Sequence, residues 1–175
     1  MLARRGEPRG IRSGRHGVAG SEPGCCHFLR IPWETLAALC QEVASQVHRE
    51  YRPEVVVGLA RAGYVPAAIV ASLLRRDLVT LRVPSRGLDA GPGITPETLT
   101  SLTPLVFDRR ALVVDETNGS GDQLITAARM LRLAGASDVR TLTLFLQRSG
   151  HHPDYFGVEG EGHVLQPWVA QVILD

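Results

Sequence analysis

The sequence predicts a single α/β domain with a doubly wound, mostly parallel sheet and a small C-terminal hood. Short apolar runs of strand length alternate with segments whose apolar residues recur every three or four positions, and the connections between them are mostly short. The chain has 175 residues, of which 44% are hydrophobic, and this is enough for one compact domain with a buried core. We expect right-handed crossovers between the parallel strands.

The first half of the domain is expected to contain a helix, a strand and a second helix. Apolar residues recur at helical spacing from Trp33 to about Tyr51, just before Pro53. The unbroken apolar run within Glu54 to Gly58 indicates a strand buried on both faces of a parallel sheet. A helix from about Val65 to Leu74 follows, with Pro66 in its first turn, where a missing N–H is tolerated.

The second half continues the alternation after one long interruption. Strand character returns at Leu78 to Val83, and Ser85 to Thr103 is predicted to be a long loop, a kind of segment that is usually functional. The remaining elements are a strand at Ala111 to Val114, a helix from about Gln123 to Leu133 and a strand at Thr141 to Leu146.

The two ends of the chain differ from this core, which we place at residues 25–150. Residues 1–24 are rich in Arg and Gly without periodicity, so we expect a flexible leader or an over-extended start. A nucleic-acid-binding arm is disfavoured because acidic residues interrupt it and no aromatic residues interleave. Residues 151–175 are expected to form the hood at the carboxyl edge of the sheet, where ligands of such sheets bind.

The composition excludes several classes of partner and site. The formal net charge is only +1, and no apolar run is long enough to span a membrane, so neither nucleic acid nor a membrane is expected as a partner. Three cysteines, two of them adjacent, fit neither a disulfide framework nor a spaced metal site. These features favour a soluble protein in the reducing cytoplasm.

The segment Val113 to Gln123 carries the most chemical information. An apolar strand delivers Asp115 and Glu116 to its carboxyl end, and Gly119 and Gly121 then let backbone N–H groups point into one concavity beside a helix start. Such a turn binds a phosphate, and adjacent carboxylates suit ribose hydroxyls or a hydrated Mg2+, so a sugar phosphate is indicated. The alternative interpretation is an ordinary strand-to-helix turn with Asp122 as the N-cap.

This segment resembles the motif with which type I phosphoribosyltransferases bind 5-phosphoribosyl-1-pyrophosphate (PRPP). Val55 to Pro66 is similar to the first core strand and pyrophosphate loop of that family. The stretches at 153–158 and 163–168 look like the hood of its hypoxanthine, guanine and xanthine branch, and the resemblance covers roughly residues 28–175.

The resemblance implies transfer of the phosphoribosyl group of PRPP to a nitrogen of a purine or purine-like base, with release of pyrophosphate. It also implies Mg2+, expected to be carried by PRPP, and a homodimer. It places Asp115 and Glu116 at the ribose hydroxyls, with Arg86 in a loop that closes over the reacting centre. The 5-phosphate would contact Thr117, Asn118, Gly119, Ser120, Gly121 and Asp122. The pyrophosphate would lie against Arg61, Ala62 and Gly63, and the base against Gln147, Tyr155, Phe156 and Val164.

Three positions depart from the purine branch. Gly119 stands where 6-oxopurine enzymes commonly have an Asp that acts on the purine proton, Gln147 stands where they have a Lys, and His163 where the family often has Trp. These departures keep two alternatives open: a PRPP-binding regulatory protein without transferase activity, and another sugar-phosphate transferase or hydrolase that uses the same phosphate turn.

Overall fold

The computed structural model describes residues 28–83, 94–147 and 151–168. The strands are β1 (Phe28–Arg30), β2 (Val55–Leu59), β3 (Asp77–Leu81), β4 (Arg110–Asn118), β5 (Asp138–Gln147), β6 (Tyr155–Gly160) and β7 (His163–Leu165). The helices are α1 (Trp33–Glu50), α2 (Tyr64–Leu74), α3 (Pro96–Val106) and α4 (Asp122–Leu133).

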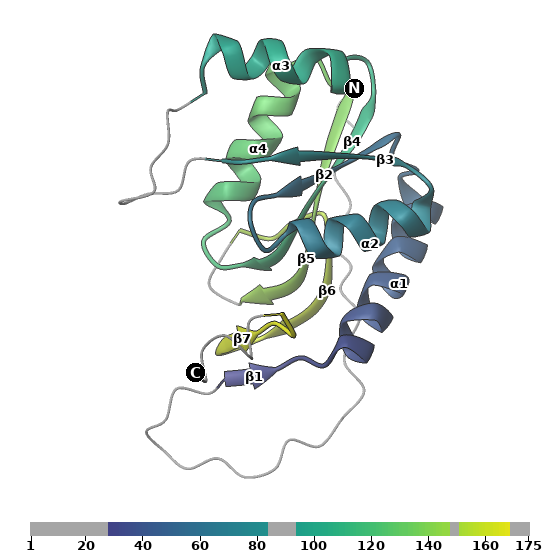
Figure 1. The fold of residues 1–175 in the computed structure, drawn as a ribbon, viewed down its shortest axis with the longest axis vertical. Coiled ribbons are helices and arrows are strands. Elements are labelled where there is room, and N and C mark those ends of the chain that lie inside the picture. Colours follow the sequence, from purple (N-terminus) through teal and green to yellow (C-terminus); the bar gives the residue numbers. More distant parts are fainter. Residues whose placement is uncertain (1–27, 84–93, 148–150, 169–175) are drawn as a thin grey trace, which may run out of the picture.

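Five strands form one sheet in the order β3-β2-β4-β5-β6, and every neighbouring pair is parallel. Helices α1 and α2 cover one face, and α3 and α4 cover the other (Figure 1). The predicted α/β class with a doubly wound parallel sheet is therefore confirmed. No helix in the described ranges has the length and apolar character needed to cross a membrane.

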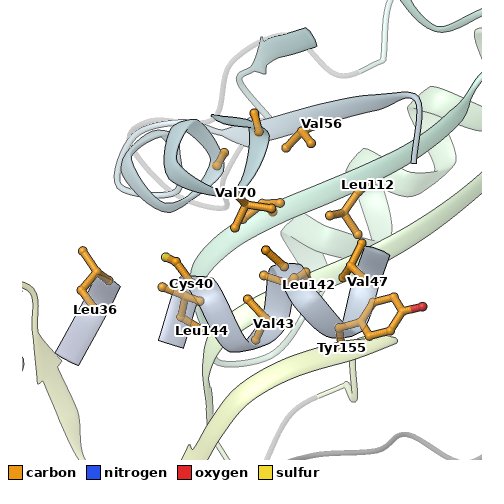
Figure 2. Packing of buried hydrophobic residues seen from close by; sticks show 14 of the residues in the cluster. Leu36, Cys40, Val43, Val47, Val56, Val70, Leu112, Leu142, Leu144 and Tyr155 are labelled. Carbon is orange, nitrogen blue, oxygen red and sulfur yellow. The ribbon is translucent and has the colours of Figure 1, made fainter. Parts of the chain in front are cut away.

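The core on the α1 side explains why this helix forms where it does. Its residues Leu36, Cys40, Val43 and Val47 are fully buried at three- and four-residue spacing and pack on strand residues such as Leu142 (Figure 2). Burial raises the pKa of the Cys40 thiol to about 11, so this cysteine acts as a core residue rather than a nucleophile.

Helix α3 corrects the expectation of a loop over the whole of Ser85 to Thr103. Thr95 caps the helix by accepting a hydrogen bond from the Thr98 N–H at 3.3 Å, and Pro96 occupies the first helical position. Leu102 and Val106 are buried against the sheet. The Thr-Pro pair is the local signal that the loop prediction overlooked. The expected loop at residues 84–93, including Arg86, lies outside the described residues.

The C-terminal segment is divided between two sheets. Strand β6 is the edge strand of the main sheet, so part of the expected hood belongs to the core. Strand β7 pairs in parallel with β1, which brings residues 28–30 beside the hood. The rings of Trp33 and Trp168 lie 5.9 Å apart between their centroids, at the start of α1 and at the last described residue of the hood. The described part of the hood thus packs against residues from the first elements of the fold.

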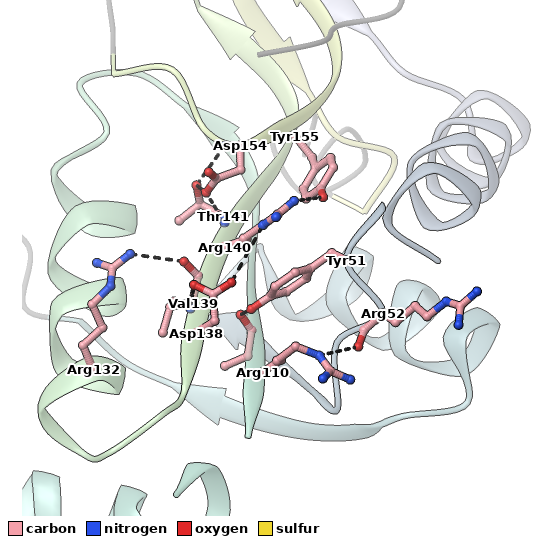
Figure 3. A network of polar contacts seen from close by, with 11 residues as sticks. Tyr51, Arg52, Arg110, Arg132, Asp138, Val139, Arg140, Thr141, Asp154 and Tyr155 are labelled. Carbon is pink, nitrogen blue, oxygen red and sulfur yellow. Dashed lines mark hydrogen bonds and ion pairs between the residues drawn. The ribbon is translucent and has the colours of Figure 1, made fainter. Parts of the chain in front are cut away.

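At the edge of the sheet where the strands begin, here called the amino edge, polar side chains bind one another (Figure 3). The Tyr51 hydroxyl donates to the Ala111 carbonyl at 3.1 Å. The Arg140 guanidinium lies 4.6 Å from the centre of the Tyr51 ring and donates to the Tyr155 hydroxyl at 2.6 Å. This network holds α1, β5 and β6 together.

Candidate functional site

The site begins where β4 leaves the sheet. Strand β4 continues to Asn118, further than the apolar run predicted, because Thr117 and Asn118 pair with β5. The turn is therefore confined to Gly119, Ser120 and Gly121. Gly121 occupies the N-cap position of α4 with a φ of 84°, and Asp122 is the first helical residue rather than the cap.

Gly121 at the N-cap of α4 has no side chain that could accept from the helix start, and the Ser120 hydroxyl accepts from the Asp122 N–H at 3.4 Å. The first backbone N–H groups of a helix have no partner within it, and they add to the positive end of the helix dipole. The turn and helix start thus offer donors to an anion, as the phosphate assignment of Thr117 to Asp122 requires.

His151 braces this turn, a role that the sequence did not suggest. The Asn118 side chain donates to the His151 carbonyl, and the His151 N–H donates to the Ser120 carbonyl at 3.3 Å. A Cβ added at Gly121 would lie only 2.5 Å from the His151 Cβ. Gly121 is therefore required both by its backbone conformation and by this close approach.

Asp115 is the most perturbed acidic group of the site. Its side chain is buried, and its Oδ1 accepts a hydrogen bond from the Glu116 N–H at 2.9 Å. Burial, reinforced by the neighbouring Glu116, raises the Asp115 pKa to about 9. Glu116 is half-buried. One carboxyl group is thus held protonated near neutral pH at the carboxyl end of the central strand, in the manner of functional sites.

The predicted pyrophosphate loop lies directly against Asp115. Arg61, Ala62 and Gly63 connect β2 to α2, and the peptide bond between Ala60 and Arg61 is cis. A Cβ added at Gly63 would lie 2.9 Å from the Asp115 Oδ1 and 2.7 Å from the Leu59 carbonyl oxygen. The structure therefore brings together two segments that are more than fifty residues apart in the chain. Arg61 is exposed.

The two main departures from the purine branch are neighbours. The Gln147 Oε1 lies 3.4 Å from the position of a Cβ added at Gly119, and the Gln147 Nε2 donates to the Gly162 carbonyl at 3.4 Å. Val164 lies in β7, half-buried, and packs against the core cluster. Gln147 and Val164 thus lie at the end of β5 and in β7, and their contact with a base stays a prediction.

Tyr155 does not fit the role that the resemblance implied. It begins β6 opposite Leu142, is only 2% exposed and packs in the α1 core, with its hydroxyl bound to Arg140. It therefore has no free ring face for a base, which corrects that expectation. Phe156 is also buried, and its ring meets the His152 ring edge-on at 6.4 Å between centroids.

Gln166 is a buried polar residue beside the site that sequence reasoning missed. It follows β7, is 4% exposed, and its Nε2 lies 3.5 Å from the Thr117 Oγ1. The available signal was a lone polar residue between Leu165 and Pro167 in an otherwise apolar piece of the hood.

Comparison with known proteins agrees with this architecture. A search of curated proteins found no match. A purine phosphoribosyltransferase from Pyrococcus horikoshii Ot3 superposes with a TM-score of 0.65 at 22% identity, over 81% of this chain and 93% of that one. A Helicobacter pylori xanthine-guanine-hypoxanthine phosphoribosyltransferase gives 0.66 at 17% identity, over 85% and 97%. A hypothetical protein from Neisseria gonorrhoeae with bound ppGpp gives 0.69 at 14% identity, over 86% and 93%.

These likenesses concern the fold, which is that of the type I enzymes. The family model of the phosphoribosyl transferase domain matches residues 32–171, a range that contains both the loop beside Gly63 and the turn that follows Asp115. The chain therefore belongs to the phosphoribosyl transferase domain family.

Proposed function

We propose that this protein transfers the phosphoribosyl group of PRPP to a ring nitrogen of a purine or purine-like base. One observation carries the proposal: the glycine loop at Gly63 touches the buried Asp115, and the phosphate-type turn leaves the same strand a few residues later. A loop, a carboxyl pair and a helix start at one edge match the pyrophosphate, ribose and 5-phosphate of a single molecule.

Each part of PRPP has a proposed partner. The 5-phosphate accepts hydrogen bonds from the turn at Gly119 to Gly121 and the start of α4. The ribose hydroxyls contact Asp115 and Glu116, whose carboxyl oxygens accept from them. The pyrophosphate lies along Arg61 to Gly63, where the exposed guanidinium adds positive charge.

The reaction breaks the bond from C1 of the ribose to the pyrophosphate oxygen and forms a bond from C1 to the base nitrogen. The base loses the proton on that nitrogen to an oxygen of the departing pyrophosphate or to solvent water. Arg61, and Arg86 as the resemblance implies, would stabilise the negative charge of the departing pyrophosphate. Gly119 offers no group to take the proton. The neutral amide of Gln147 can orient the heterocyclic base, but it cannot accept a proton from it.

Mg2+ is the cofactor that we propose. Among the described residues there is no group of three His, Cys, Asp or Glu side chains that could hold a metal ion. We propose that the ion is held mainly by phosphate oxygens of PRPP, with Asp115 and Glu116 near it as oxygen donors. When bound, Mg2+ supplies positive charge that offsets the charge on the pyrophosphate.

A regulatory PRPP-binding protein is the second candidate. The observation that favours it is the adjacency of Gly119 and Gln147, which leaves the base side of the site without an ionisable group from these two positions. One structure of the same fold contains ppGpp, which like PRPP combines a ribose with pyrophosphate groups. We therefore include ppGpp as a competitor in the binding test.

The experiment measures pyrophosphate release from PRPP and Mg2+ with hypoxanthine, guanine, xanthine, adenine, uracil and orotate, alongside calorimetric PRPP binding. We expect turnover with a purine. The double variant Asp115→Asn/Glu116→Gln should lose PRPP affinity by roughly 100-fold or more, because both ribose partners are altered.

The matched control carries Glu34→Gln, at an exposed carboxylate of α1, and it removes one negative charge, as the site variant does when Asp115 is protonated. It should bind PRPP normally. PRPP binding that is lost in the site variant, without turnover of any base, would support the regulatory protein instead. Retention of full PRPP affinity in the site variant would contradict the site itself.

A further inference from the structure

Gln166 is the buried polar side chain with an unsatisfied end. Its Oε1 is fully enclosed and has no hydrogen-bond partner within the part of the chain that the structure describes. Its Nε2 has one contact, to the Thr117 hydroxyl at 3.5 Å. A buried amide oxygen without a partner is costly and rare in folded proteins, so a donor from outside the described residues is needed to complete its hydrogen bonds.

Exchanging the oxygen and nitrogen of the amide does not remove this deficit. In the exchanged orientation the oxygen would accept from the Thr117 hydroxyl, and the nitrogen would then lack an acceptor. In either orientation one end of the Gln166 side chain has no partner in the described protein. The missing hydrogen bond therefore results from where the Gln166 side chain lies and not from how its amide is oriented.

The position is the proposed active site. Side chains alternate along a strand, so the Thr117 side chain lies on the same side of β4 as that of Asp115, which precedes it by two residues. Gly119 follows two residues later and adjoins the Gln147 amide. The Gln166 amide therefore meets β4 at Thr117, two residues after the carboxyl group that we assign to the ribose, and the Gln147 amide adjoins the turn at Gly119.

We propose that Gln166 is a specificity-determining residue that binds the acceptor base directly. With Nε2 held by Thr117, the free Oε1 accepts a hydrogen bond from an N–H on the edge of the base. The base that accepts the phosphoribosyl group is then a neutral heterocycle with a ring N–H, as in a lactam. The uncharged amide of Gln166 recognises it through this hydrogen bond. This inference rests on the proposed phosphoribosyl transfer and deepens it.

The test replaces Gln166 by Met, which keeps the shape of the side chain and removes the amide. Hypoxanthine, guanine and xanthine are titrated in the presence of Mg2+ and pyrophosphate, and binding is followed by tryptophan fluorescence. The two tryptophans of the chain are suited to this, because Trp168 lies two residues after Gln166 and contacts Trp33. PRPP affinity and thermal stability are measured on the same samples.

In the Gln166→Met variant we expect about a tenfold weaker affinity for the base that binds best, because the N–H of the base loses its acceptor. PRPP affinity should stay within about twofold, and the melting temperature should not fall, because an unsatisfied buried amide has been removed. Gln46→Met is the matched control: Gln46 is a buried glutamine of α1 that donates to Glu50, far from the site. It should leave base affinity unchanged.

Three results would overturn the inference. Unchanged base affinity in Gln166→Met, with PRPP binding intact, would show that Gln166 does not contact the base and would leave the proposed function standing. A fall in melting temperature larger than that of Gln46→Met would assign Gln166 a structural role. Failure of the wild-type protein to bind PRPP would overturn the proposed function and this inference together.

Discussion

The two edges of the sheet differ in how their polar groups are satisfied. At the amino edge, Tyr51, Arg140 and Tyr155 contact one another, and the Asp154 carboxylate accepts from both the backbone and the hydroxyl of Thr141 at 2.8 and 2.9 Å (Figure 3). At the carboxyl edge, Asp115 is buried beside another carboxylate and Gln166 has an unpartnered amide oxygen.

This difference distinguishes the amino edge, whose polar groups stabilise the fold, from the carboxyl edge, where we propose that PRPP binds. Polar groups whose partners are all in the protein contribute to stability and offer nothing to a ligand. Buried polar groups without a hydrogen-bond partner lower the stability of the fold. Proteins keep such groups where a ligand supplies the missing hydrogen bond. Changes at the carboxyl edge should therefore alter function with little loss of stability, and changes at the amino edge should do the reverse.

The largest effect is expected from Gly119→Asp, which restores the acidic residue of the purine branch. A Cβ at this position would contact only the flexible end of Gln147, at 3.4 Å, so the fold should tolerate the substitution. A carboxylate there can take the base proton, and we expect turnover with a 6-oxopurine to rise about 100-fold. Steady-state pyrophosphate release measures this.

Gly121→Asp is the control for that experiment. It adds the same charge two residues away, but at a φ of 84° and with a Cβ that would lie 2.5 Å from the His151 Cβ. It should destabilise the turn and weaken PRPP binding. An equal gain in turnover from both variants, or a gain from neither, would refute the role given to the carboxylate at position 119.

At the amino edge we expect Arg140→Met to lower the free energy of unfolding by about 2 kcal/mol. The change removes the hydrogen bond to the buried Tyr155 hydroxyl and the contact with the Tyr51 ring. PRPP affinity of the folded variant should equal that of the wild type. Urea denaturation and calorimetry measure the two quantities.

Arg129→Met serves as its control, since Arg129 is an exposed arginine of α4. Its effect on stability should stay within about 0.5 kcal/mol. If Arg140→Met instead weakened PRPP binding while leaving stability intact, the division between the two edges would be wrong.

The smallest effect is expected from Asp115→Asn on stability, and it should depend on pH. The folded-state pKa of Asp115 is raised from 3.8 to about 9, so between these values unfolding releases its proton. Wild-type stability therefore loses a contribution as pH rises through this window, and the variant lacks that loss. We expect the variant to be the more stable protein, with a difference in the free energy of unfolding that is larger at pH 8 than at pH 5.

Denaturation of both proteins at several pH values measures this difference. Asp108→Asn, at an exposed carboxyl group after α3, should show no such trend. A stability difference that shrinks as pH rises would mean that Asp115 is ionised in the folded protein.

Local patterns in the sequence determined the order of most elements and the phosphate turn. Helical spacing located α1, the apolar run within Glu54 to Gly58 located β2, and the carboxylates followed by glycines located the turn after β4. These features depend on residues close together in the chain, because periodicity, helix starts and glycine turns are local properties.

Only the tertiary structure decided which of these residues meet. The extension of β4 to Asn118 required pairing with β5, and the position of Tyr155 in the core required β6 to join the sheet beside β5. The contact of Gly63 with Asp115 and the unsatisfied amide of Gln166 arise between segments far apart in the sequence. Strand pairing and burial are set by long-range packing, and no local pattern encodes them.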